Sequence, residues 1–215
     1  MKTILFDLDG TLTDPALGIT NAVQHALHYY DIEETYDNLL KFIGPPLVDC
    51  FMEMYDFNKK KAEQAVVYYR EYFSVTGLFE NKVYPEMENF LNQLKQDGYQ
   101  LAVATSKPEI FANQIMDHFN LSQYFTAIYG ATLDGKISRK ADVIAYALQE
   151  LNIEDKNKVI MVGDRQHDII GAHENHIKAI GVLYGYGNID EMKEYQADWI
   201  VDNLKQLYQT IKEVY

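Results

Sequence analysis

Two carboxylates stand two residues apart at the end of a short apolar run near the start of the chain. Residues 4–6 read Ile-Leu-Phe, Asp7 and Asp9 flank Leu8, and Gly10 and Thr11 follow. A short apolar run bounded by turn residues is typical of a buried strand. Open α/β sheets bind ligands at the carboxyl ends of such strands. Gly10 permits a tight turn whose backbone N–H groups are free to face an anion. A surface turn with two solvated acids is the alternative on this stretch alone.

Three further groups of polar residues follow predicted strands or begin a predicted helix. Thr105 ends a predicted buried strand, Leu101–Thr105, and Ser106 and Lys107 follow it; the hydroxyl and N–H groups of Thr105 and Ser106 suit phosphate oxygens. Lys140 begins a helical stretch, and residues 163–168 carry two acids, Asp164 and Asp168, after another buried run. Each group by itself has an ordinary explanation: a helix cap, a solvated lysine or a strand-end turn. Their joint occurrence at one predicted sheet edge favours a functional site.

The residue types indicate phosphoryl chemistry. Asp7, Asp9 and Asp164 supply hard oxygen ligands, which suit Mg²⁺ bound together with water and a substrate phosphate. A carboxylate can also act as a nucleophile and form an aspartyl-phosphate. A metal would neutralise phosphate charge and hold the nucleophile near phosphorus. Lys140 would offset the remaining negative charge.

The elements that must position these groups form two kinds of segment. From Tyr84 onward, buried runs alternate with helical stripes, which predicts an α/β fold with a doubly wound parallel sheet. Residues 14–82 show helical periodicity and no convincing strand, which predicts an inserted all-helical domain. The α/β core domain would then comprise residues 1–13 and 83–215. Two predicted helices show apolar residues at helical spacing, which should form one face of each helix. The first has Met87, Phe90, Leu91 and Leu94, and the second has Ile110, Phe111, Ile115 and Phe119.

Composition narrows the classes of partner. The 215 residues carry a formal net charge of −13, which disfavours nucleic acid polymers and anionic membranes as partners. The single cysteine, Cys50, excludes an internal disulfide, fits a reducing cytoplasm and is expected to serve packing. No apolar run approaches about 18 residues. We therefore expect a cytoplasmic protein. The phosphoryl chemistry of the candidate site, and not the composition, makes a small phosphorylated metabolite the expected partner, and we expect a monomer or a homodimer.

The motifs resemble those of the haloacid dehalogenase superfamily of phosphatases. The resemblance covers essentially the whole chain, and its most specific parts are residues 7–11, Asp-Leu-Asp-Gly-Thr, and Gly163-Asp164 with Asp168. It implies a Rossmann-like core, with residues 14–82 as the family's cap, which opens and closes over the site. It also implies a nucleophilic role for Asp7 and a general acid/base role for Asp9.

The resemblance further implies a Mg²⁺ site and a phosphate site. The metal would be bound by the Asp7 carboxylate, the backbone carbonyl of Asp9 and Asp164, with Asp168 supporting it through water. Thr105, with Gly10, Ser106 and Lys107 beside it, would bind phosphate. Lys140 would orient the nucleophile and the phosphate.

Individual residues separate branches of this superfamily. Dehalogenases lack an acid two residues after the nucleophile, so Asp9 disfavours them, and Thr11 disfavours sugar-phosphate mutases. Residues 105–108, 163–168 and 181–187 look like the phosphoglycolate phosphatase group, which includes related 5′-nucleotidases. Ser106 and Ala141 depart from the phosphoglycolate phosphatases themselves, and residues 133–144 lean toward the nucleotidase-like branch. The sequence predicts a Mg²⁺-dependent, phosphoglycolate phosphatase-like phosphomonoesterase with an aspartyl-phosphate intermediate. A 5′-nucleotidase is the alternative, and a mutase or a non-enzymatic binding protein are further ones.

Overall fold

The chain divides into two compact units. The computed structural model describes residues 1–214. The core unit consists of Met1–Asp14 and the residues from Val83 onward, and the helical unit consists of Pro15–Lys82. Within residues 1–214, none of the helices combines the length and the apolar character that a bilayer span requires.

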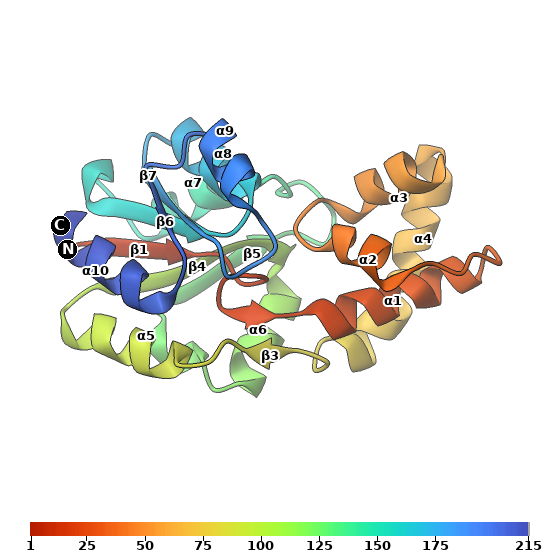
Figure 1. Ribbon diagram of the computed structural model, residues 1–215, viewed down its shortest axis with the longest axis horizontal. Helices are drawn as coiled ribbons and strands as arrows, with labels where there is room; N and C mark the ends of the chain where they lie inside the picture. The colour runs from red at the N-terminus through yellow and green to blue at the C-terminus, as the bar shows by residue number, and fades with distance from the viewer. Residues whose placement is uncertain (215) are drawn as a thin grey trace. The chain divides into compact units, whose positions relative to one another are not determined.

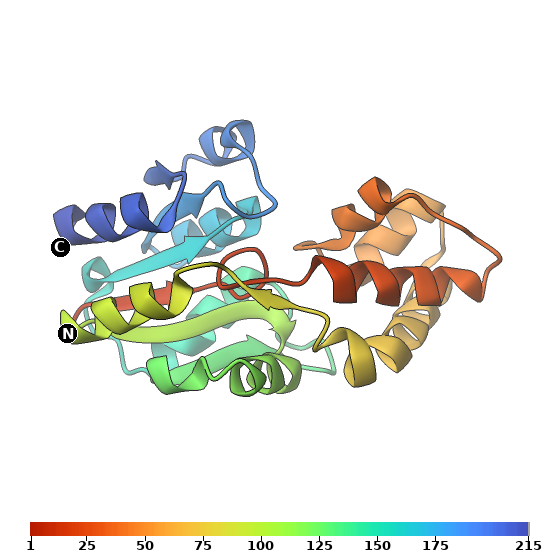
Figure 2. The same cartoon turned by 60° about the horizontal axis from the view of Figure 1, so that its bottom comes forward.

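The core unit contains a parallel sheet with strand order β5-β4-β1-β6-β7-β8. Figure 2 shows β1, in red, between β4 in green and β6 in cyan. The chain moves outward from β1 to β5 on one side and from β6 to β8 on the other, so the direction of winding switches beside β1. The six strands are β1 (Thr3–Phe6), β4 (Gln100–Pro108), β5 (Ala127–Ala131), β6 (Val159–Gly163), β7 (Lys178–Val182) and β8 (Trp199–Val201).

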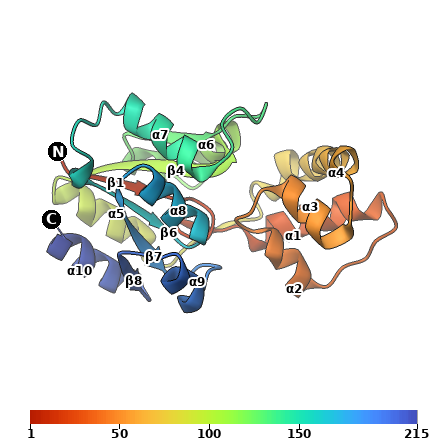
Figure 3. The same ribbon diagram turned by 90° about the horizontal axis from the view of Figure 1, so that it is seen from above.

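Helices cover both faces of this sheet, which confirms the predicted doubly wound α/β fold. Figure 1 shows α7 and α8 on one side of the sheet and α5 and α6 on the other, and α10 lies beside α5 (Figures 1 and 3). The helices of this unit are α5 (Met87–Gln96), α6 (Glu109–His118), α7 (Lys140–Glu150), α8 (Gln166–Glu174), α9 (Ile189–Glu194) and α10 (Leu204–Val214), with short 3₁₀ turns at η3 (Ser122–Tyr124) and η4 (Lys156–Lys158).

Strand β1 is completely buried, because apolar side chains pack against both of its faces. Leu5 belongs to the cluster beneath α7 and α8. Phe6 points to the other face, where its ring meets Phe90 of α5 and Phe125 edge-on, with centroids 6.1 Å apart in both pairs. Burial on both faces explains why β1 appears in the sequence as a continuous apolar run without alternation.

The two apolar helix faces predicted for this unit are buried to different extents. In α5, Met87, Phe90, Leu91 and Leu94 are all buried, as predicted. In α6 the prediction holds at Ile115, which is buried, and is wrong at Ile110, which is 51% exposed, because the helix also buries Ala112 and Met116. Strand β4 also extends three residues beyond the predicted Leu101–Thr105 run, to Pro108, with a shift in its pairing to β5 between Thr105 and Pro108.

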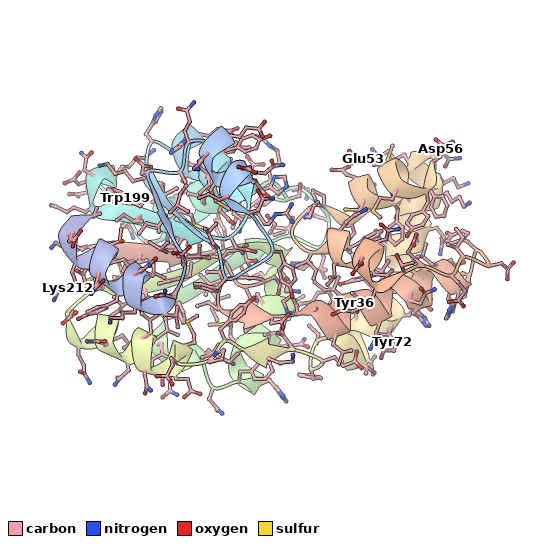
Figure 4. The ribbon with its side chains drawn as sticks, in the orientation of Figure 1. Tyr36, Glu53, Asp56, Tyr72, Trp199 and Lys212 are labelled. Carbon is pink, nitrogen blue, oxygen red and sulfur yellow. The ribbon has the colours of Figure 1, made fainter. Side chains whose placement is uncertain are left out.

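The helical unit is built around α1, which packs against α4, and α3 packs against α4 as well. Helix α3 begins directly after Pro46, and Cys50 is buried on it, consistent with the expected packing role. Tyr72, labelled in Figure 4, donates a hydrogen bond to Glu80 over 3.0 Å. The elements are α1 (Ala16–His28), α2 (Tyr36–Leu39), η1 (Leu40–Phe42), α3 (Leu47–Tyr55), α4 (Lys59–Tyr72) and η2 (Phe73–Gly77), a π-helical turn.

Two short strands mark the places where the chain enters and leaves the helical unit. They are β2 (Thr13–Asp14) and β3 (Lys82–Val83), which pair as a separate two-stranded sheet. The N–H of Tyr84, immediately after β3, donates to the carbonyl of Leu12 over 3.2 Å. Within the core unit, the returning chain is therefore attached to the loop that follows Asp7.

We expect Gly18→Ala to destabilise the helical unit. A Cβ atom at Gly18 would lie 2.0 Å from the carbonyl oxygen of Gly77, so α1 and η2 would have to separate. Overpacking of this kind costs about 1–3 kcal/mol, and the midpoint of urea unfolding, followed by circular dichroism, measures it. Leu17→Ala is the matched control, because Leu17 is 51% exposed on the same turn. Equal midpoints for Gly18→Ala and the wild type would contradict this close contact.

Candidate active site

Asp7 and Asp9 lie in a compact loop that continues from β1. The N–H of Asp7 donates to the carbonyl of Val162 over 2.9 Å, which extends the pairing of β1 with β6 by one residue. The carbonyl of Leu8 then accepts hydrogen bonds from Leu12 and Thr13, over 2.9 and 3.0 Å. These bonds close the loop tightly, so the two carboxylates are held at the carboxyl edge of the sheet.

Gly10 is required in this loop for two reasons. Its φ of +81° lies in the left-handed region, which side chains disfavour, and a Cβ atom there would lie 2.1 Å from Oδ2 of Asp164. The N–H of Gly10 donates to the carbonyl of Thr13 over 2.8 Å. The prediction of a free Gly10 N–H is therefore wrong, because the turn itself uses that donor.

Three carboxylates meet at the ends of β1 and β6. Asp7, Asp164 and Asp168 each offer one oxygen, and these oxygens all lie within 4.8 Å of one another. Asp164 and Asp168 are fully buried and Asp7 is 8% exposed. Asp168 lies in the first turn of α8, where its Oδ2 accepts a hydrogen bond from the N–H of Arg165 over 3.1 Å. The structure thus brings together three of the residues that the sequence proposed for a metal site.

Lys140, the first residue of α7, is the cation among these acids. Its Nζ lies 2.7 Å from Oδ1 of Asp7 and 2.8 Å from Oδ1 of Asp168, and it donates to the carbonyl of Ala104 over 3.0 Å. Burial lowers the pKa of Lys140, but the attraction of Asp168 and Asp7 outweighs it and raises the pKa above its ordinary value. The amine is therefore charged, and three fixed acceptors orient it.

One lysine does not balance three buried carboxylates. Burial, with repulsion from Asp168 and Asp7, raises the pKa of Asp164 well above its ordinary value. Burial also raises the pKa of Asp168, to about 6, although Lys140 opposes that change. A divalent cation coordinated by these oxygens would relieve the repulsion, and an oxygen-only set of carboxylates fits Mg²⁺. The residues present therefore fit a metal ion of this kind.

Asp9 lies outside this cluster and has a lysine of its own. Nζ of Lys107 is 2.7 Å from Oδ2 of Asp9, and both side chains are largely buried. Burial raises the pKa of Asp9, while the charge of Lys107 and its hydrogen bond lower it, and the net shift is upward. The sequence proposed Lys107 only as a phosphate ligand, so its pairing with Asp9 is a contact that the sequence did not predict.

The Thr105 segment lies next to these two ion pairs. Thr105 is 2% exposed, and its Oγ1 accepts a hydrogen bond from the N–H of Lys107 over 3.3 Å. Ser106 is half-buried. The carbonyl of Ala104, the residue before Thr105, accepts a hydrogen bond from Lys140. The end of β4 therefore contains Lys107 and contacts Lys140, with Thr105 between these two points.

The loop after β7 contains contributors to the site that sequence reasoning missed. The N–H of Tyr186 donates to Oδ2 of Asp164 over 2.8 Å, and the hydroxyl of Tyr184 donates to the carbonyl of Thr11 over 3.1 Å. The hydroxyl of Tyr186 also forms a hydrogen bond with Asp14. Glycines at 185 and 187 allow this loop to lie against Gly10 and Asp164. The alternation of glycine and tyrosine after a buried run was the available signal.

Comparison with known proteins agrees with this geometry. Residues 4–182 match the haloacid dehalogenase-like hydrolases. The chain belongs to this family. It is similar to a 5′-nucleotidase of Pseudomonas aeruginosa, with 45% identity over 97% of this chain and 95% of that protein. It is also similar to a phosphoglycolate phosphatase of Aquifex aeolicus, with 35% identity over 86% of each chain.

Solved structures give the same assignment. A crystal structure described as a predicted phosphatase from Clostridium acetobutylicum is 50% identical, with a TM-score of 0.95 over 99% of this chain and 98% of that one. The family and these relatives identify the protein as a haloacid dehalogenase-like phosphatase. The expectation of a phosphatase from this superfamily is thereby confirmed.

We expect Lys140→Met to destabilise the core unit strongly, because it leaves Asp7 and Asp168 buried without their cation. Removing one partner of a buried ion pair costs about 3–5 kcal/mol. Urea unfolding in the presence of a chelator measures the free energy of unfolding. The double variant Lys140→Met with Asp168→Asn should recover part of the lost stability, since it removes one unpaired charge.

The matched control for this substitution is Lys136→Met. The Lys136 side chain is 84% exposed in its ion pair with Asp134, so its loss should change the free energy of unfolding by less than about 1 kcal/mol. If Lys140→Met were as stable as Lys136→Met, Lys140 would not be holding the buried carboxylates together.

Proposed function

We propose that this phosphatase is a Mg²⁺-dependent phosphomonoesterase that forms an aspartyl-phosphate on Asp7 and hydrolyses nucleoside 5′-monophosphates. The observation that carries the proposal is the buried cluster of Asp7, Asp164 and Asp168 around Lys140. A carboxylate at a strand end, oriented by a charged amine and lying beside two further acids, has the arrangement that phosphoryl transfer to a carboxylate needs.

In the first step, a carboxylate oxygen of Asp7 attacks phosphorus. The new bond joins that oxygen to phosphorus, and the bond between phosphorus and the leaving oxygen breaks. Asp9, as the carboxylic acid, gives its proton to the leaving oxygen, so the leaving group departs as a neutral alcohol. Lys140, bonded to Oδ1 of Asp7, holds the nucleophile in one orientation throughout.

In the second step, the direction of proton transfer reverses. The Asp9 carboxylate takes a proton from water as the water oxygen attacks phosphorus. The bond from phosphorus to Asp7 breaks, inorganic phosphate leaves, and both aspartates return to their starting states. The pairing of Asp9 with Lys107, apart from the cluster of Asp7, Asp164 and Asp168, supports this division of roles.

Mg²⁺ would be bound by the carboxylates of Asp7 and Asp164 and the backbone carbonyl of Asp9, with Asp168 acting through water. When bound, it supplies positive charge that offsets the charge of the phosphate and of the clustered acids. The raised pKa of Asp164 supports this assignment, because it reports a buried carboxylate that lacks a cation of its own.

Phosphate binding is proposed for Thr105, Ser106 and Lys107, whereas Gly10, whose N–H is bonded to Thr13, shapes the turn beside them. Because Nζ of Lys107 is already 2.7 Å from Asp9, an incoming phosphate would draw this amine toward its own negative charge. That movement would weaken the interaction with Lys107 that lowers the pKa of Asp9, at the moment when Asp9 must carry a proton.

Residues 14–82, which include the whole helical unit, are proposed as the cap of the enzyme. Residues 1–13 and 83–215 are proposed as its catalytic domain. The chain leaves the core unit directly after the loop that carries Asp9, and it returns at Val83. An insertion at this place in the chain is suited to cover the site during reaction, which excludes water that would compete with the leaving group.

The substrate class rests on the relatives. Identity to the Pseudomonas aeruginosa 5′-nucleotidase, 45% over nearly the whole chain, exceeds the 35% to the Aquifex aeolicus phosphoglycolate phosphatase. Residues 133–144 lean the same way in the sequence, and Ser106 and Ala141 disfavour phosphoglycolate. Phosphoglycolate is the second candidate, supported by the second relative and by residues 105–108 and 181–187.

A panel of phosphomonoesters with Mg²⁺ tests the proposal, with released phosphate as the readout. We expect nucleoside 5′-monophosphates to give a higher kcat/KM than phosphoglycolate. Asp7→Asn should retain less than about 1% of wild-type turnover on every substrate, since the attacking oxygen is altered. Asp142→Asn, an exposed acid on α7, is the control. Preference for phosphoglycolate would overturn the substrate, and activity of Asp7→Asn would overturn the nucleophile.

The role of Asp9 predicts a dependence on the leaving group. Asp9→Asn should lower kcat by about 10²–10⁴-fold with an alkyl phosphate, which needs a proton to leave. With 4-nitrophenyl phosphate the first step should be nearly unaffected, because nitrophenolate leaves without a proton, and a pre-steady-state burst of nitrophenolate should appear. An equal loss on both substrates, with no burst, would show that Asp9 is not the acid.

Metal binding can be measured without turnover. Mg²⁺ at about a hundredfold its Kd should raise the Tm by about 5 °C or more, because it binds only the folded cluster. Asp164→Asn should abolish this shift and should itself raise the Tm of the metal-free protein, since Asp164 is repelled by Asp168 and Asp7. Asp142→Asn should keep the shift. A shift that persists in Asp164→Asn would place the ion elsewhere.

A further inference from the structure

A cavity of about 510 Å³ lies in the core unit beside α5 and α10, and none of the residues proposed for catalysis lines it. Its volume falls in the range of small-molecule sites, about 300–1,000 Å³. Its walls are mainly aromatic, formed by Tyr84, Phe90, Tyr184 and Tyr208, with Leu204 beside them. Four aromatic side chains therefore line one space.

Three of the residues that line the cavity carry uncharged amide groups. Asn89 and Gln93 line it from α5, and Asn203 lines it from the residue before α10. Oδ1 of Asn203 accepts a hydrogen bond from the N–H of Gln206 over 3.0 Å, so its NH₂ group is the part that remains for a ligand. Amide side chains offer both donors and acceptors, which match the nitrogen-containing edge of a heterocycle.

The charges around the cavity cancel. Glu86 and Lys205 are the two charged residues among those that line it. Across the chain as a whole the formal net charge is −13. A balanced cavity on a strongly acidic protein offers no attraction to a phosphate or a carboxylate, so charge complementarity favours a neutral ligand.

The aromatic side chains that line the cavity are held in place by contacts with one another and with residues outside it. The Tyr208 hydroxyl donates to Oδ2 of Asp97 over 2.6 Å, and Lys212, labelled in Figure 4, lies 3.4 Å from the same oxygen. On the opposite side, the Tyr184 hydroxyl is bonded to Thr11, and the rings of Tyr184 and Tyr84 meet edge-on at 5.2 Å. A preformed site loses little conformational entropy when a ligand enters.

We propose that this cavity binds a neutral, planar nitrogen heterocycle of nucleoside size. A flat ring stacks on aromatic side chains, and the three amides bind its donor and acceptor edge. This site goes beyond the proposed function, because its ligand carries no phosphate and contacts none of the residues proposed for catalysis.

Isothermal titration with adenosine tests the proposal on the whole chain. A ligand of this size is expected to bind one site per chain with a Kd of about 0.1 mM. Ribose, which lacks the ring, should not bind. No heat of binding from adenosine at about 5 mM would overturn the proposal.

Tyr208 locates the ligand and separates a ring contact from a structural effect. Tyr208→Ala should weaken adenosine binding about tenfold or more, because it removes a stacking face. Tyr208→Phe should keep the affinity within about threefold, although it loses the same hydrogen bond to Asp97. Tyr124→Ala, a half-buried tyrosine of the same unit outside the cavity, is the control and should bind as the wild type does.

Three outcomes would overturn this site. Unchanged binding in Tyr208→Ala would place adenosine elsewhere, including the candidate active site. Equal losses in Tyr208→Phe and Tyr208→Ala would show that the hydroxyl bond, and not the ring, matters. A dimer that dissociates on Tyr208→Ala would show that a second copy fills the cavity. The KM for a nucleoside monophosphate should stay unchanged in Tyr208→Ala, so the result does not depend on the proposed substrate.

Discussion

Burying three carboxylates around one lysine is the interaction on which the rest of the core unit depends. Removing charged groups from water costs free energy unless partners replace the lost hydration. Lys140 serves Asp7 and Asp168, while Asp164 receives the N–H of Tyr186 and, at 3.3 Å, the hydroxyl of Thr11. The negative charge that remains is stabilised only by a further cation. A site with this surplus is poised to bind a metal and, through it, a phosphate.

The parallel sheet provides the rigidity that this arrangement needs. Asp7 follows β1 and Asp164 follows β6, and these strands are direct neighbours with every residue of β1 paired. Lys140 reaches the acids from the first turn of α7, where the carbonyl of Ala104 in β4 also accepts from its amine. Three adjacent strands and one helix start therefore determine the positions of the acids, and packing on both faces of β1 prevents them from shifting.

Two lysine–aspartate pairs of different character occupy one small site. Asp7 shares Lys140 with Asp168, whereas Asp9 is paired with Lys107. Different surroundings for two neighbouring carboxylates are a recurring way to assign them different roles. The separation suits an enzyme in which one aspartate forms the covalent bond and the other transfers protons, as proposed for Asp7 and Asp9.

The doubly wound fold, the family and the set of acids at the sheet edge could be predicted from the residues alone. They follow from local patterns: buried runs, the apolar spacing in α5 and the positions of Asp7, Asp9, Asp164 and Asp168. Three contacts became visible in the folded chain: Lys107 pairs with Asp9, the Gly10 N–H is used within its own turn, and Tyr186 supports Asp164. The two side-chain contacts depend on strand register and loop path, which bring residues distant in sequence within hydrogen-bonding reach. The Gly10 bond depends on the backbone angles of one turn, which residue types alone do not specify.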